Sequence, residues 1–157
     1  MKAPSAVLGG LYVVAYAHVD DSVQFTQTYT LLVDGHWLGA VPNLAICQEF
    51  DSHEYAIQHC TEEWEPVGIA AGFESRAEAI RRIELSYHGI HAKWVNASIT
   101  FEEAKVFHDT ELRAESCSFC GKTPLEVSKM VAAMTPGEVK ICNHCIDTFH
   151  ASIHQDE

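Results

Sequence analysis

The first two-thirds of the chain carries short runs of hydrophobic residues interspersed with polar ones, a pattern typical of β-strands. Residues 11–19 and 24–33 are each predicted to form a strand. Asp34 and the glycine after it readily adopt the positive φ angles of a two-residue hairpin turn, so residues 36–41 are expected to pair back on the second strand. The pattern therefore predicts an antiparallel hairpin near the N-terminus.

The strand signals become weaker in the middle of the chain. Residues 44–50 are predicted to be irregular or helical. Residues 54–60 are predicted to form a strand, although the acidic residues at 51 and 54 could also start a helix. Residues 64–70 read as another short strand, and Pro66 confines it to an edge or to an early position because proline donates no ladder hydrogen bond.

Two helices are predicted from capping boxes, each followed by apolar residues at helical spacing. Ser75 and Glu78 form the first box, and this helix is expected to end at Gly89. The second box begins at Thr100 and predicts a helix over about residues 101–114. Together with the strands, these helices predict an α+β domain over residues 1–114, with an antiparallel sheet and two helices.

Composition narrows the possible partners. The 157 residues carry a formal net charge of −12, so the chain repels polyanions, and no basic patch is present that would bind nucleic acid. No apolar run approaches the roughly 18 residues of a membrane-spanning helix. Gly9 and Gly10 interrupt the N-terminal apolar run, so we expect no secretory signal and a cytoplasmic location.

Four of the six cysteines stand in two C-x-x-C pairs, Cys117 with Cys120 and Cys142 with Cys145. Two-residue spacing lets both thiolates of a pair reach one ion, and two such pairs complete a tetrahedral site for one structural zinc ion. Two disulfides would be the alternative in a secreted chain, and His144 could in principle replace one sulfur ligand. Four sulfur ligands leave no coordination position for a catalytic water.

The segment between the two pairs is expected to contain a helix followed by a strand. Thr123 can cap a helix that continues to about Met134, and residues 138–141 then form a strand that leads to the second pair. A closing helix is expected over residues 146–153. Because about 40 residues bury little core, zinc should supply much of the folding free energy.

Residues 115–154 resemble the N-terminal C4 zinc-binding domain of the ClpX protein unfoldase. The resemblance rests on the segment Cys117-Ser-Phe-Cys-Gly-Lys122, on Glu126-Val127 and Lys129, and on Ile141-Cys142 and Cys145-Ile-Asp147. It implies a small treble-clef-like finger over residues 115–157 that dimerises through apolar surface and recruits adaptors and some substrates. The motor that follows the finger in the unfoldase has no counterpart in the sequence, and the loop around residues 133–137 looks longer than in that family.

The candidate partner-binding residues come from both parts of the chain. By resemblance, four apolar residues of the finger are candidates for dimer or peptide contacts, although each could equally pack inside the finger: Phe119, Val127, Val131 and Ile146. In the first domain, an acidic segment with an exposed-looking aromatic residue could bind a basic partner: Glu62, Glu63 and Trp64.

Three functions follow as hypotheses. We expect a non-enzymatic zinc-binding adaptor or dimerisation protein, whose partner is a second copy or a proteolytic or chaperone component. The first alternative is an acidic immunity protein or antitoxin that neutralises a basic toxin, with Trp37, Trp64 and Trp94 as possible anchors. The second is a thiol-dependent enzyme that uses Cys47 or Cys60.

Overall fold

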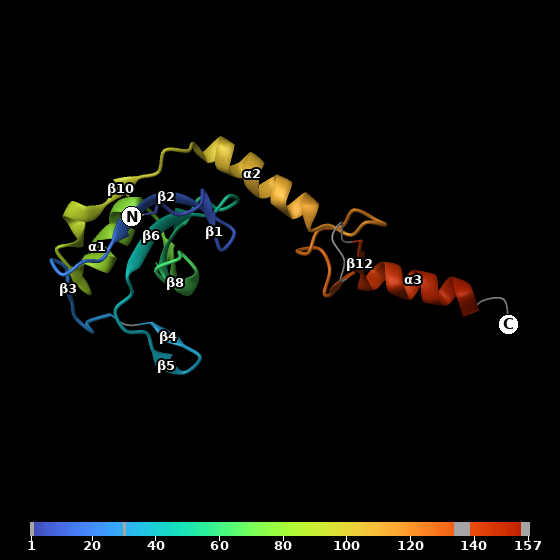
Figure 1. The fold of residues 1–157 in the computed structure, drawn as a ribbon, viewed down its shortest axis with the longest axis horizontal. Coiled ribbons are helices and arrows are strands. Elements are labelled where there is room, and N and C mark those ends of the chain that lie inside the picture. Colours follow the sequence, from blue (N-terminus) through green and yellow to red (C-terminus); the bar gives the residue numbers. More distant parts are fainter. Residues whose placement is uncertain (1, 30, 134–138, 155–157) are drawn as a thin grey trace. The chain divides into compact units, whose positions relative to one another are not determined.

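The computed structural model describes residues 2–29, 31–133 and 139–154. The chain divides into two compact units, residues 1–105 and 106–157, and the helix α2 (Phe101–Ala114) runs across this division. The boundary predicted after residue 114 stays a prediction. The α+β class is confirmed, with a sheet and helices in the first unit and a small finger in the second (Figure 1).

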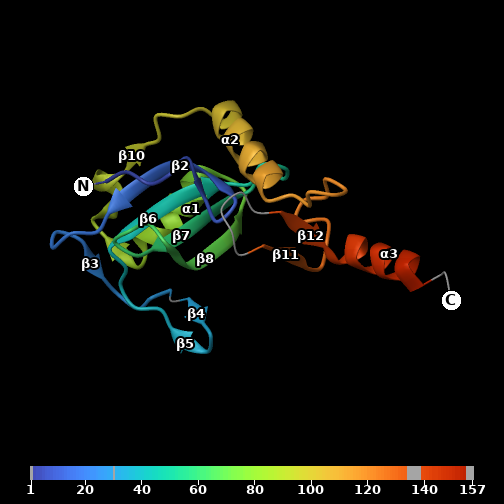
Figure 2. The same ribbon diagram turned by 45° about the vertical axis from the view of Figure 1, so that its right-hand side comes forward.

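The first unit is built on an antiparallel six-stranded sheet, which Figure 2 shows from a second side. The strands follow the order β1-β2-β6-β7-β8, and β10 also pairs with β2. Two small two-strand pairs, β3 with β9 and β4 with β5, lie outside this sheet. The elements of the main sheet are β1 (Val7–Leu8), β2 (Leu11–His18), β6 (Asn43–Gln48), β7 (Tyr55–Cys60), β8 (Pro66–Phe73) and β10 (Val95–Asn96). The other elements of this unit are β3 (Gln24–Phe25), β4 (Leu32–Val33), β5 (His36–Trp37), α1 (Arg76–Glu84), β9 (Tyr87–His88) and the 3-10 helix η1 (Ile90–Lys93).

Strand β6 corrects the prediction of an irregular or helical segment at 44–50. It is the third strand of the path, and every residue from Asn43 to Cys47 is buried. Leu44 and Ile46 enter one hydrophobic cluster, whereas Ala45 and Cys47 enter a second cluster on the other face. A strand that is covered on both faces has no polar alternation, so its sequence lacks the period that reveals a strand.

The two hydrophobic clusters also show that strand β2 exchanges its two faces along its length. Val13 packs in the same cluster as Ala45, whereas Ala15 and Ala17 pack in the other cluster. In a regular strand, residues 13, 15 and 17 would all point to the same face. The register between β2 and β6 shifts between Val13 and Ala15. A β-bulge at this point exchanges the faces of the strand, because it inserts one residue into the alternation.

The predicted hairpin forms, but its strands are shorter than expected. Asp34 and Gly35 have φ angles of 51° and 79°, and β4 pairs with β5 across them. The expected continuous strand over residues 24–33 is wrong, because among its described residues only Gln24–Phe25 and Leu32–Val33 form strands. Between them the chain is held to the α1–β9 connection, where the Ser86 hydroxyl accepts from the Tyr29 N–H at 3.2 Å and donates to the Tyr29 carbonyl at 2.9 Å.

The first predicted capping box forms. The Ser75 hydroxyl accepts from the Glu78 N–H at 3.2 Å, and the Glu78 carboxylate accepts from the Glu74 N–H at 2.9 Å. The helix ends at Glu84 and not at Gly89, because Tyr87 leaves it to pair with β3 and is buried there. Apolar spacing alone therefore overestimated the length of α1.

The remaining predictions for this unit are confirmed in outline. Strand β7 covers the predicted segment 54–60, and β8 lies at the end of the strand order, as Pro66 requires. Helix α2 begins after Thr100, whose hydroxyl and N–H both donate to the Glu103 carboxylate at 2.9 Å. Among the residues that the structure describes, no helix combines the length and the apolar character needed to cross a membrane.

His59 is a buried titratable group in strand β7. Its side chain is 7% exposed. Burial lowers the pKa of His59 to about 4 from the ordinary value of 6.5, and backbone groups of Gly68 and Ile57 only partly oppose this effect. His59 is therefore neutral in the folded chain at neutral pH.

The first unit is expected to lose stability as the pH falls from 6.5 to about 4, the unfolded and folded pKa values of His59. Above this range His59 is neutral in both states. Within it the unfolded chain binds a proton that the folded chain does not, so the unfolding free energy falls by up to about 3 kcal/mol. Urea unfolding followed by tryptophan fluorescence measures this unit alone, because all three tryptophans lie within residues 1–105.

In the variant His59→Gln, the fall in unfolding free energy between pH 6.5 and about 4 should be smaller by up to about 3 kcal/mol. The variant His36→Gln, at an exposed histidine of β5, should keep the dependence of the parent chain. Equal slopes in all three proteins would contradict the assignment to His59.

Candidate metal centre

The first cysteine pair lies in a tight turn. The Gly121 N–H donates to the Cys117 carbonyl at 2.9 Å, and the Cys117 N–H donates to the Lys122 carbonyl at 2.9 Å. Gly121 has a φ of 73°, which explains why a glycine follows the pair. The turn is joined to the next strand where the Ser118 N–H donates to the Lys140 carbonyl at 2.8 Å.

The second pair lies where a strand becomes a helix. Strand β11 (Met130–Ala132) pairs antiparallel with β12 (Lys140–Cys142), and α3 (Asn143–His154) follows directly. Cys142 is the last residue of β12, and Cys145 stands in the first turn of α3. The order of turn, hairpin and helix is that of a treble-clef finger. The predicted closing helix is confirmed and starts three residues earlier than expected.

The helix predicted from Thr123 to Met134 is wrong. The Thr123 N–H does donate to the Glu126 carboxylate at 2.8 Å, but the Glu126 N–H donates to the Thr123 carbonyl at 3.0 Å, so only half of the capping box forms. The chain nevertheless turns and continues into β11, where Met130 lies opposite Cys142. Hydrogen bonds between Lys129 and Asn143, at 3.1 and 3.3 Å, hold this register. Met134, the turn at 136–137 and residue 138 lie outside the described residues.

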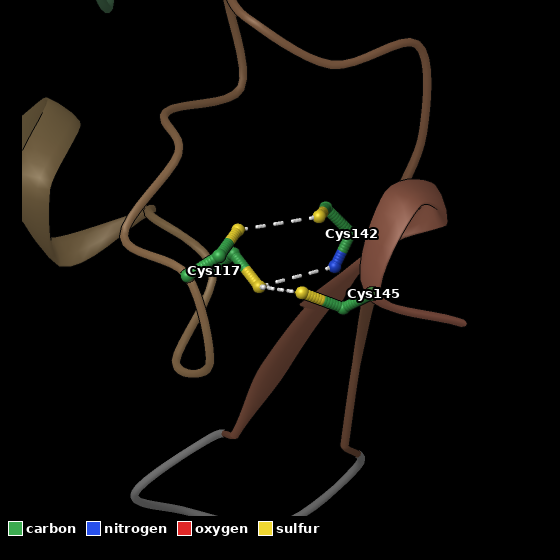
Figure 3. A group of neighbouring side chains, drawn as sticks. Cys117, Cys142 and Cys145 are labelled. Atoms are coloured by element: carbon green, nitrogen blue, oxygen red, sulfur yellow. Dashed lines mark hydrogen bonds between the residues drawn. The ribbon is translucent and has the colours of Figure 1, made fainter. Parts of the chain in front are cut away.

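The four sulfur atoms are arranged around one point. All four lie within 4.8 Å of one another, and two contacts each join a sulfur of the first cysteine pair to a sulfur of the second. The Cys117–Cys145 distance is 3.8 Å and the Cys120–Cys142 distance is 3.6 Å. A zinc ion with four sulfurs at about 2.3 Å requires sulfur–sulfur separations of about 3.8 Å, so the four cysteines fit zinc. Figure 3 shows Cys117 on its loop facing Cys142 and Cys145.

The electrostatics of the site favour a bound cation. Burial opposes ionisation of the Cys117 thiol, but backbone N–H groups of Cys120, Phe119 and Cys142 outweigh it and lower the Cys117 pKa to about 6. The contact from the Cys142 N–H to the Cys117 Sγ is 3.3 Å. Burial and the neighbouring sulfurs raise the pKa of Cys145 to about 12. Four thiolates at this spacing therefore need a divalent cation to neutralise their repulsion.

The ligand set decides what the metal does. Four cysteine sulfurs fill the tetrahedral coordination of zinc, so the ion has no open position for water or substrate. The zinc of this site is structural.

The comparison with known families agrees with this geometry. Residues 115–155 match the family model of the ClpX C4-type zinc finger. The matched residues lie within the second unit. No solved structure was found that matches this chain.

The candidate contact residues of the ClpX-type finger are differently exposed. Val127 is half-buried, whereas Phe119, Val131 and Ile146 are 55%, 54% and 40% exposed. The Phe119 ring meets the Phe149 ring edge-on at 5.4 Å. Sequence reasoning missed Phe149, although its spacing of three residues from Ile146 on the closing helix could have indicated it.

In the acidic segment of the first unit, the tryptophan predicted as an exposed anchor is buried. Glu62 and Glu63 are exposed, but Trp64 is only 5% exposed, so the interpretation of Trp64 as a surface residue is wrong. Its backbone φ is 67°, and its Nε1 donates to the Lys2 carbonyl at 2.8 Å. Acidic neighbours made this tryptophan look exposed. Trp37 is 65% exposed.

Cys47 and Cys60 do not belong to the metal centre. Both are fully buried beside Trp64 in the second hydrophobic cluster. Burial raises the pKa of Cys47, and it raises the pKa of Cys60 to about 11. Both thiols are therefore protonated at neutral pH, which opposes a role as nucleophile. Within the described residues, the four finger cysteines are the one group placed to hold a metal.

Proposed function

We propose that this chain is a non-enzymatic adaptor whose ClpX-type finger binds another protein chain. The observation that carries the proposal is a closed zinc site surrounded by exposed apolar side chains. A structural ion explains why the finger folds, but folding alone does not require Phe119, Val131 and Ile146 at the surface. Exposed apolar groups on a small rigid module favour protein binding.

We propose a second copy of the chain as the first partner of the finger, in agreement with the dimerisation that the resemblance implies. The Phe119–Phe149 pair presents two aromatic rings, the residue type that most often carries binding energy in interfaces. The zinc thiolates also favour a reducing compartment, because oxidation would remove the ligands.

Light scattering of the zinc-loaded chain at tens of micromolar tests this proposal. The parent chain should be a dimer, and Phe119→Asp should be a monomer that keeps its zinc. Leu85→Asp is the matched control, since it places the same charge at an exposed leucine of the first unit, and it should stay dimeric. A monomeric parent chain that also retains no protein in a pulldown from its native host would contradict the adaptor role.

The second candidate function, an acidic immunity protein or antitoxin, is favoured by the net charge of −12 and by the exposed Glu62 and Glu63. Co-expression with the products of neighbouring genes tests it. Rescue from a toxic neighbour, lost in a Glu62→Lys/Glu63→Lys variant, would support this function, and the absence of any rescue would end it.

A further inference from the structure

Helix α3 carries two exposed histidines one turn apart. His150 and His154 are both exposed, and α3 buries none of its residues. The centroids of the two imidazole rings lie 4.5 Å apart, with an angle of 53° between the ring planes. Residues four positions apart lie on the same face of a helix, so the helical backbone itself makes these two rings neighbours.

Two imidazoles at this spacing form a chelating pair. Histidines at positions i and i+4 of a helix can each give one ring nitrogen to the same metal ion, because both rings project from one face. In the part of the chain that the structure describes, neither ring has a hydrogen bond or an ion pair, so the ring nitrogens are open to a ligand. Imidazole nitrogen suits Zn²⁺, Cu²⁺ and Ni²⁺, whereas Mg²⁺ and Ca²⁺ prefer oxygen.

The pair is separate from the cysteine site. Cys145 is the zinc ligand that α3 contributes. With 3.6 residues per turn, His150 and His154 lie about 140° and about 180° around the helix axis from Cys145, so they occupy the opposite side of the helix. His144, the other histidine of α3, stands next to Cys145 in the sequence and is not a member of the pair.

The charges of α3 favour a cation at the pair. The helix contains no lysine or arginine, and its one carboxylate, Asp147, stands three positions before His150 and therefore on the same face. His154 is the last residue of α3, where the helix dipole places partial negative charge. A divalent ion held by the two histidines would therefore meet attraction, and no cationic side chain of this helix would repel it.

We propose that His150 and His154 bind a second zinc ion reversibly. Each histidine supplies one ring nitrogen, and water fills the remaining coordination positions. Among the described residues, a group of three or more possible ligands occurs only at the four cysteines, so the second ion has fewer protein ligands and binds more weakly than the structural one. Its water ligands can be exchanged for another ligand, unlike the closed set of the cysteine site. This site is independent of the adaptor role and of the dimer proposed above.

The test is a titration of the reduced, zinc-loaded full chain with further Zn²⁺, followed by long-range ¹H–¹⁵N NMR of the imidazole nitrogens. Zn²⁺ is the suitable probe because the cysteine site already holds this ion, so its exchange does not change the finger. We expect saturable shifts of one ring nitrogen of His150 and one of His154 as a single further ion binds. Mg²⁺ at the same concentration should leave both signals unchanged.

Two variants separate a chelating pair from general attraction to histidines. His150→Gln should weaken binding of the further Zn²⁺ about tenfold or more, because a second nitrogen on the same helix acts at a high effective concentration. The double variant Ser152→His/His154→Ser keeps ten histidines but places two of them only two positions apart, on different faces, and should lose binding to the same extent. All three positions are exposed, so both variants should keep the cysteine-bound zinc.

Several results would overturn the proposal. No uptake of further Zn²⁺ would show that the pair does not chelate. Shifts that do not saturate, or that appear first at other histidines, would show general surface binding. Unchanged affinity in the double variant would mean that histidine content, and not helical spacing, attracts the ion. Uptake without shifts at His150 and His154 would place the ion on carboxylates.

Discussion

Removing zinc from the reduced chain should unfold the finger and leave the first unit folded. Among the described residues of 106–157, only Cys117, Lys140 and Cys142 are buried, and two of these three are metal ligands. Helix α3 buries none of its residues. The described part of the finger therefore has no hydrophobic core that could replace the metal. Structural zinc typically supplies about 10–16 kcal/mol in such modules.

The two units can be followed separately in the intact chain. All tryptophans and tyrosines lie within residues 1–105, so tryptophan emission reports the first unit alone. A chelator should reduce the far-ultraviolet circular dichroism of α3 and leave the tryptophan emission unchanged. Added Zn²⁺ should restore the signal, and added Mg²⁺ should not, because Mg²⁺ does not bind thiolates well. A finger that keeps its dispersed NMR signals without metal would contradict this prediction.

Replacing Trp64 with alanine should lower the unfolding free energy of the first unit by about 3–5 kcal/mol. The indole packs with Leu8, Val13 and Cys60, and it meets the Tyr16 ring edge-on at 5.6 Å. Its removal leaves a cavity and an unpaired carbonyl at Lys2.

The matched control is Trp37→Ala, since Trp37 is 65% exposed in the β4–β5 hairpin. Its effect should stay within about 0.5 kcal/mol. Urea unfolding monitored by the two tryptophans that each variant retains gives both values. Similar losses in the two variants would mean that Trp64 is not the buried anchor of the second cluster.

Features that depend on neighbouring residues could be predicted from the sequence. The cysteine spacing, the turn at Asp34 and the box at Ser75 each involve atoms within a few residues, and all three are present in the structure. The box at Thr123 shows the limit of such reasoning. The bond from its backbone N–H to the Glu126 carboxylate forms, yet pairing of Met130 with Cys142 decides that the next segment is a strand.

Features that depend on distant pairing could not be predicted. Strand β6 is buried on both faces by residues from other strands and from helix α1, so nothing local distinguishes it from a loop or a helix. Tyr29, His59 and Arg82 line one pocket between α1, β7 and β8, and no sequence motif connects them. Trp64 was wrongly predicted to be exposed because its polar neighbours in the sequence are not its neighbours in the folded structure.

The register of the β11–β12 hairpin places a metal ligand at one of its two ends. Met130 lies opposite Cys142 at the metal end, whereas Ala132 lies opposite Lys140 where the strands leave the pairing. Residues inserted after position 133 would therefore lengthen the chain at the end away from the sulfurs. This junction is a suitable place to graft an epitope or a fluorescent label, because the inserted segment would leave the zinc coordination intact.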